Sequence, residues 1–100
     1  MAEFALFFSG AFLCNCVPHL VAGLMGEAFP TPFAKPRGVG DSPAVVNVVW
    51  GFFNLVVGVL LFRASEHLST LQLMSLLAGA MAMGIFLALH FSRVKARRPR

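Results

Sequence analysis

The chain has 100 residues, of which 58% are hydrophobic and only 12% are charged, with a formal net charge of +4. Soluble domains carry about a quarter charged residues. The composition therefore excludes an ordinary water-soluble domain, which needs more polar surface than this chain supplies.

The charged residues leave three uncharged stretches, at 4–26, 42–62 and 67–92. Each can cross a bilayer, because about 20 residues span the hydrocarbon core as an α-helix. Irregular backbone facing lipid would leave amide groups unpaired, so the crossing segments must be helices. We predict an all-α membrane protein with a single three-helix transmembrane domain over 1–100. Its expected parts are spans at about 4–26, 43–62 and 68–92, a long loop at 27–42, a short hairpin at 63–67 and a basic cytoplasmic tail at 93–100.

The first predicted helix carries one stripe of polar and small residues. Asn15, His19 and Gly23 follow each other at intervals of four, so they share a face of the helix. Pro18 has no N–H to donate to the carbonyl of Cys14, and its ring pushes against that turn. We therefore expect this helix to be kinked at Pro18, beside Asn15 and near the middle of the membrane.

The loop at 27–42 is rich in residues that interrupt a regular helix: Pro30, Pro32, Pro36, Gly38 and Gly40. Phe29 and Phe33 flank the first two prolines, so we expect the loop to be ordered against the membrane surface. Two interpretations stay open, a stiff connector and a gate or docking surface. Asp41 or Ser42, followed by Pro43, is typical of the start of the next helix.

The second and third predicted helices carry different faces. Asn47, Trp50 and Asn54 recur at spacings of three and four, so they form one polar face of the second helix. The third helix has small residues at every fourth position: Ala80, Gly84 and Ala88. Small residues let helix backbones approach closely in a membrane, so we predict that this face packs against another helix and joins copies of the chain.

Depth in the membrane relates the first two helices, because they run antiparallel and must match level for level. Asn15 and Asn54 both fall near the middle of their spans, so we expect them to face each other. His19 and Trp50 both fall about six to eight residues from the inner ends, so they should also lie close together. Asn47 should lie nearer the cytoplasmic surface.

These five residues are the candidate pathway for a small polar solute or ion, because polar side chains are costly in lipid and commonly mark such pathways. The alternative is that they only hold the helices together, through hydrogen bonds worth roughly 0.6 to 2 kcal/mol each. Three helices cannot enclose a pathway, so an oligomeric transporter or channel-like subunit requires a homo-oligomer or a larger membrane complex. A non-catalytic accessory or assembly subunit of a larger complex is the other hypothesis. The four carboxylates lie outside the spans in no catalytic arrangement, so we expect no enzyme and no cofactor.

Cys14, Cys16 and His19 cluster in the sequence and suggest a metal site as an alternative use of this turn, since soft ligands suit Cu(I). On a regular helix the side chains of Cys14 and Cys16 project about 200° apart. Both could bind one ion only if Pro18 unwinds the turn. Buried Cys is commonly a small apolar packing residue, and we expect no metal.

Seven of the eight Lys and Arg residues belong to the loop at 27–42 or the tail at 93–100, and only Arg63 lies on the opposite side. Cytoplasmic segments of membrane proteins carry the excess of Lys and Arg. The pattern therefore predicts an external N-terminus and a cytoplasmic C-terminus, in a bacterial inner (plasma) membrane. The tail adjoins a span and has no interleaved aromatics, so we expect anionic lipid headgroups as its partner and no nucleic acid.

A reporter fused after Arg100 should therefore be cytoplasmic, and a reporter at the N-terminus should be external. Replacing the five basic tail residues with neutral ones should weaken this preference, because the orientation rule acts through Lys and Arg near helix ends. Alkaline phosphatase and fluorescent-protein fusions measure the two locations. An external C-terminus would contradict the predicted orientation.

Overall fold

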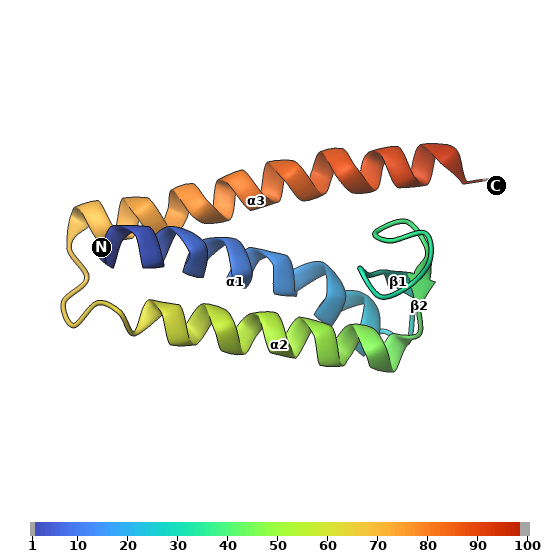
Figure 1. The fold of residues 1–100 in the computed structure, drawn as a ribbon, viewed down its shortest axis with the longest axis horizontal. Coiled ribbons are helices and arrows are strands. Elements are labelled where there is room, and N and C mark those ends of the chain that lie inside the picture. Colours follow the sequence, from blue (N-terminus) through green and yellow to red (C-terminus); the bar gives the residue numbers. More distant parts are fainter. Residues whose placement is uncertain (1, 99–100) are drawn as a thin grey trace.

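The computed structural model describes residues 2–98, which form three α-helices. Helix α1 covers Ala2–Leu24, α2 covers Ala44–Phe62 and α3 covers Thr70–Arg97. All three are long and apolar enough to cross a membrane, as the sequence predicts. Consecutive helices run antiparallel along the long axis of a molecule that measures 47 × 24 × 20 Å (Figure 1).

The helix boundaries differ from the predicted spans most at the C-terminal end of α3. Residues 93–97, expected as part of the tail, continue the helix to Arg97. Val94 is buried there, and Lys95 and Arg97 lie in the last turn, where cations interact favourably with the helix dipole. Packing and electrostatics thus both favour the extension. Arg100, the last residue of the predicted tail, lies outside the described residues.

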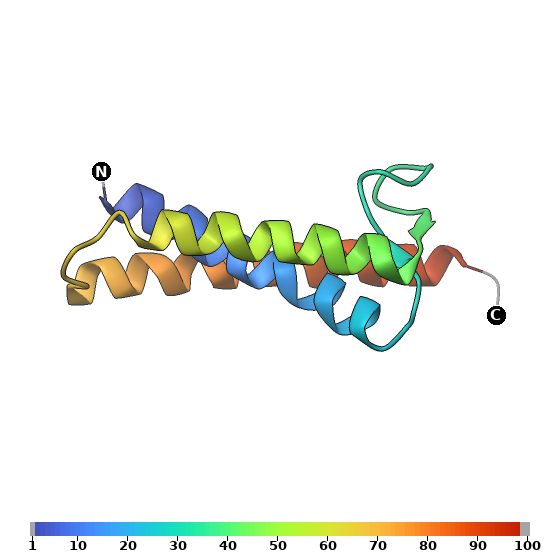
Figure 2. The ribbon, with the colours of Figure 1, turned by 90° about the horizontal axis from the view of Figure 1, so that it is seen from below.

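Helix α1 lies between α2 and α3 and contacts both (Figures 1 and 2). Two glycines let α2 come close: a Cβ added at Gly51 would meet the Leu20 side chain, and one added at Gly58 would meet Leu13. The Ser9 hydroxyl donates to the Gly58 carbonyl oxygen at 2.6 Å. The contact between α1 and α2 therefore combines close packing with hydrogen bonding, the two interactions that hold helices together in lipid.

The contact between α1 and α3 depends on two other glycines. A Cβ added at Gly79 would collide with the carbonyl oxygen of Phe7, and one added at Gly10 would collide with that of Leu76. Gly79 and Val94 are the buried residues of α3. Of the glycines in the described helices, Gly10 and Gly79 therefore lie closest to the backbone of a neighbouring helix, and the predicted packing stripe did not include them.

The predicted packing stripe of α3 lies next to this contact. A Cβ at Gly10 would come within 2.9 Å of the Ala80 nitrogen, and a Cβ at Gly84 would lie 3.6 Å from the Cys14 sulfur. Ala80 and Gly84 therefore lie against α1 of the same chain, whereas Ala88 is exposed. That the stripe also joins copies of the chain stays a prediction.

The long loop contains two short strands, which the all-α prediction did not include. Strand β1, Phe29–Pro30, pairs antiparallel with β2, Asp41–Ser42, and Phe29 lies opposite Ser42. The Thr31 and Ser42 hydroxyls are hydrogen-bonded at 2.5 Å, and both residues are buried. The loop thus folds back on itself at one end of the bundle, between α2 and α3 (Figure 1).

Side chains from α3 and from Arg98, just after its end, hold this loop. The His90 Nε2 lies 2.6 Å from the Gly38 carbonyl oxygen, which can only accept, so His90 donates. Arg98 pairs with the Asp41 carboxylate at 2.6 Å and donates to the Val39 carbonyl oxygen at 2.7 Å. The loop is therefore fixed to the bundle from two directions, by its own strands and by α3.

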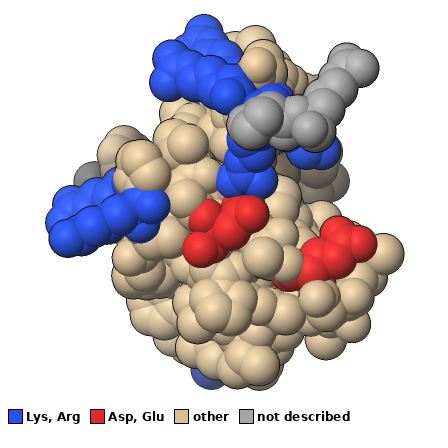
Figure 3. All heavy atoms as spheres, turned by 90° about the vertical axis from the view of Figure 1, so that its right-hand side faces the viewer, with Lys and Arg blue, Asp and Glu red and all other residues tan. Residues whose placement is uncertain are grey.

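One end of the molecule holds both the loop and the C-terminal end of α3, and we call it the basic end. It carries six described Lys and Arg residues: Lys35, Arg37, Arg93, Lys95, Arg97 and Arg98. Figure 3 faces this end and shows basic side chains above and to the left of two acidic patches. The N-terminal end of α1 and the connection at 63–69 lie at the opposite end (Figure 1).

Gly79→Ala should weaken the contact between α1 and α3, because the new Cβ would meet the Phe7 backbone, which cannot move aside without separating the helices. Overpacking of this kind costs about 1–3 kcal/mol. Gly84→Ala is the matched control, since a Cβ there makes an ordinary contact with Cys14. Thermal unfolding in detergent, followed by circular dichroism, should show a lower midpoint for Gly79→Ala alone. Equal midpoints for the two variants would contradict this packing.

Candidate functional site

A hydrogen-bonded pair of amides joins α1 and α2. The Asn15 Nδ2 donates to the Asn54 Oδ1 at 3.0 Å, and the Asn54 Nδ2 donates to the Trp50 carbonyl oxygen at 2.8 Å. Asn15 therefore faces Asn54, as matched depth predicts. Asn54 is fully buried with both its donor and its acceptor in use. Asn15 keeps its Oδ1 without a partner among residues 2–98.

Asn47 connects α1, α2 and the loop. The His19 Nδ1 lies 2.8 Å from the Asn47 Oδ1. The Asn47 Nδ2 donates toward three backbone carbonyl oxygens, those of Phe29, Ser42 and Pro43, at 3.0, 3.1 and 3.3 Å. Carbonyl oxygens can only accept, which identifies the amide nitrogen and leaves the Asn47 Oδ1 as an acceptor. His19 therefore donates through Nδ1–H, and in the neutral form of the ring Nε2 is then an acceptor.

Trp50 lies beside His19 within a group of aromatic rings. The ring centroids of His19 and Trp50 are 6.3 Å apart, edge to face. Trp50 also contacts Phe33 of the loop at 5.0 Å and stacks on Phe53 at 5.6 Å. The expected proximity of His19 and Trp50 is present, although the hydrogen bond of His19 goes to Asn47. The Trp50 Nε1 is buried and has no hydrogen-bond partner in the part of the chain that the structure describes.

A cavity of about 370 Å³ opens beside these side chains, between the three helices and the loop. We call it the loop cavity. Its chemically distinctive lining residues come from every part of the fold: Asn15, His19, Trp50, Met83, His90 and Arg37. The rest of the wall is mostly apolar, so these few polar groups decide what the cavity can hold.

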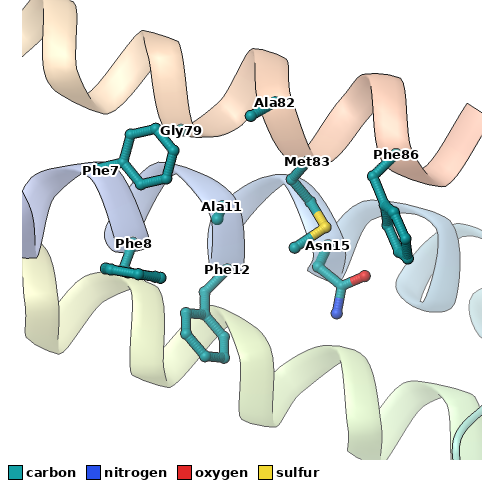
Figure 4. A pocket seen from close by; sticks show the side chains of 9 residues that line it. All are labelled: Phe7, Phe8, Ala11, Phe12, Asn15, Gly79, Ala82, Met83 and Phe86. Atoms are coloured by element: carbon teal, nitrogen blue, oxygen red, sulfur yellow. The ribbon is translucent and has the colours of Figure 1, made fainter.

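An apolar pocket of about 360 Å³ adjoins the loop cavity along α1 (Figure 4). Phe8 and Phe12 line it from α1, and Met83 and Phe86 line it from α3. Asn15 lines both hollows, and in Figure 4 its amide points from α1 toward α2. Asn15 therefore lies at the boundary between the apolar pocket and the more polar loop cavity.

The five residues predicted for a pathway separate into two groups. Asn15, His19 and Trp50 line the loop cavity. Asn47 and Asn54 are fully buried behind it, with none of their surface exposed. The second group positions the first, because Asn47 orients the His19 ring and Asn54 holds the Asn15 amide.

His90 and Arg37 also line the loop cavity, and sequence reasoning did not include them in the site. His90 reaches it because its ring donates to Gly38 across 52 positions of sequence. Arg37 reaches it because the loop folds back over the helices. Periodicity along one helix gives no signal for either contact, but an ionisable residue near the end of a span could have been paired with a glycine-rich loop.

The alternative metal ligands do not come together. The Cys16 thiol is buried and donates to the Leu13 carbonyl oxygen at 2.9 Å. Cys14 lies near Gly84 of α3, and the His19 Nδ1 is bonded to Asn47. Among residues 2–98, no group of three His, Cys, Asp or Glu residues has the arrangement of a metal site.

Asn47→Ala should release the loop, because the Phe29, Ser42 and Pro43 carbonyl oxygens lose their shared donor. Asn54→Ala is the matched control, since Asn54 is equally buried but bonds only to Asn15 and Trp50. Hydrogen exchange in nanodiscs should increase at 29–42 in Asn47→Ala and remain unchanged there in Asn54→Ala. At a net contribution of about 0.5–1.5 kcal/mol per hydrogen bond, we expect exchange to be faster by roughly tenfold or more. Unchanged protection in Asn47→Ala would contradict its role as the loop anchor.

The chain matches no protein-family model, no curated protein and no solved structure. What the loop cavity can do therefore has to follow from its own groups: an amide oxygen, an imidazole nitrogen and a buried indole N–H in a largely apolar wall.

Proposed function

We propose that this protein is a multi-pass membrane protein of a bacterial inner membrane that acts as an oligomeric transporter or channel-like subunit for a small polar solute or ion. The observation that carries the proposal is the convergence of Asn15, His19 and Trp50 on one cavity. Polar groups inside a membrane helix bundle are costly and commonly mark such pathways.

The hydrogen-bonding chemistry supports a solute that donates. The Asn15 Oδ1 and the His19 Nε2 are both acceptors without partners among the described residues. An ammonium group, a hydroxyl group or a hydrated cation satisfies such acceptors. Arg37 lines the same cavity from the loop and disfavours a bare cation next to it. A neutral hydroxylated organic solute fits these groups best.

The architecture supports an assembly of copies. Helix α1 lies between α2 and α3, so three helices alone leave the loop cavity without a complete wall. A second copy or a larger partner would complete it, with the basic end at the cytoplasmic surface. In this proposal a kink at Pro18, one turn from Asn15, allows the end of α1 that carries His19 to move.

A second candidate function is an accessory or assembly subunit of a larger membrane complex. The amide groups of Asn47 and Asn54 favour this role, because their hydrogen bonds hold the helices and the loop together. Purification in mild detergent separates the two candidates. Homo-oligomers alone favour transport, and stoichiometric co-purification of a larger complex favours the accessory role.

Water access to the loop cavity tests the transport proposal directly. The test uses a chain in which Cys14 and Cys16 are replaced by Ala. In this chain Met83→Cys places a thiol in the loop cavity. Met81→Cys is the control and places a thiol on the outer face of α3, because Met81 is 65% exposed. A charged thiol reagent should modify Met83→Cys in nanodiscs roughly tenfold faster or more, because a thiol reacts as its thiolate, which lipid suppresses.

Mass spectrometry of the labelled protein gives the two rates. Equal, slow labelling of both variants would mean that no water reaches the cavity, and the accessory role would then be preferred. Equal, rapid labelling would mean that the outer face of α3 is not covered by lipid, which would contradict the placement of α3 in the membrane.

A further inference from the structure

A groove on another side of α1 has a different character from the loop cavity. It consists of two adjoining hollows between α1 and α3, of about 470 and 390 Å³, which share Pro18, Phe91 and Lys95 as lining residues. It begins at Cys14 and Gly84 and reaches the basic end. We call it the α1–α3 groove. None of Asn15, His19 and Trp50 lines it.

The length of the groove matches one leaflet of a bilayer. Its α1 side runs from Cys14 to Glu27, just after the helix ends. The ten helical steps from Cys14 to Leu24, at about 1.5 Å each, extend about 15 Å, which is about half the thickness of a bilayer core. The groove therefore reaches from about the mid-plane to the headgroup region at the basic end.

The wall nearest the mid-plane is apolar and shallow. Val17 contributes to it from α1 and is 53% exposed, while Gly84 and Ala88 leave room on α3 because their side chains are absent or small. Phe91 lines both hollows. An extended hydrocarbon chain is the occupant that such a surface accepts inside a membrane.

The hollow at the basic end carries charges of both signs. Lys95 and Glu27 both line it and are exposed, and neither side chain has an ion pair or a hydrogen bond to another described residue. Arg98 also lines it, but its guanidinium is already paired with Asp41. A free cation and a free anion in one hollow complement a headgroup that contains both a phosphate and an ammonium group.

We infer that the α1–α3 groove is a binding site for a membrane phospholipid with a primary ammonium headgroup, of the phosphatidylethanolamine type. Lys95 binds the phosphate, Glu27 accepts from the ammonium group, and one acyl chain lies over Gly84 and Ala88, which then face lipid and not a second copy of the chain. The groove adjoins the loop cavity at Pro30, Leu87 and Phe91, but none of the polar residues Asn15, His19 and Trp50 of the proposed solute pathway lines it.

The charge pattern distinguishes this lipid from the common alternatives. A singly anionic headgroup without an ammonium group brings its negative charge beside Glu27 and leaves that carboxylate unpaired. A quaternary ammonium headgroup keeps the charge but has no N–H to donate to the Glu27 carboxylate. Only the primary ammonium headgroup satisfies both Lys95 and Glu27.

Native mass spectrometry of the full chain tests the inference with three lipids of identical acyl chains: phosphatidylethanolamine, phosphatidylcholine and phosphatidylglycerol. One phosphatidylethanolamine should be retained about fivefold more than either of the others, as expected for one partly exposed charged contact. Lys95→Gln should abolish the preference. Arg93→Gln is the matched control, since Arg93 is a basic residue one turn or less away that does not line the groove. Glu27→Gln should shift the preference toward phosphatidylglycerol.

The apolar part of the groove has its own pair of variants. Ala88→Leu should reduce phosphatidylethanolamine retention by filling the groove, whereas Ala82→Leu, at an equally exposed alanine of α3 that lines the pocket of Figure 4 instead, should not. Equal retention of all three lipids by the natural chain would overturn the inference. Equal losses of the phosphatidylethanolamine preference in Lys95→Gln and Arg93→Gln would also overturn it, because they would show attraction to the basic end as a whole. Full retention of phosphatidylethanolamine in Ala88→Leu would do the same.

Discussion

The side chain of Asn47 is the junction on which the rest of the structure depends. It is fully buried, and its bonds reach His19 on α1, both strands of the loop through Phe29 and Ser42, and Pro43 at the start of its own helix. Removing a buried donor leaves its buried acceptors unsatisfied, at a cost of about 1–3 kcal/mol for each such group. One amide thus fixes the loop, the start of α2 and the orientation of the His19 ring together.

Around this junction, the central position of α1 divides the molecule into two kinds of surface. One side of α1 presents Asn15 and His19 to the loop cavity, where unpartnered polar atoms face a mostly apolar wall. Another side forms an apolar groove that ends at Lys95 and Glu27. The first surface suits a small solute held by hydrogen bonds, and the second suits a lipid held by charge at one end. Both proposals depend on the position of α1, which contacts α2 and α3 but keeps part of its surface uncovered.

The sequence predicts the number of helices and the residues that meet at the same depth. Three uncharged stretches predict three helices, and matched depth predicts that Asn15 meets Asn54 and that His19 approaches Trp50, because helical rise is constant. The path of the loop is different, since it depends on bonds from His90 and Arg98 to backbone carbonyl oxygens more than 50 positions away. Helical periodicity likewise cannot distinguish Gly79, which meets α1 most closely, from the stripe of Ala80, Gly84 and Ala88 beside it.

The tautomer of His19 tests the Asn47 junction most directly, because the amide orientation dictates which ring nitrogen carries the proton. Nitrogen NMR of the ¹⁵N-histidine-labelled protein in bilayers reads this state, and a His19→Gln sample assigns the signal. We predict a neutral ring with a protonated Nδ1, bonded to Asn47, and a bare Nε2 on a ring that lines the loop cavity. A ring protonated at Nε2 with a bare Nδ1 would contradict both the junction and the acceptor that the proposed solute site requires.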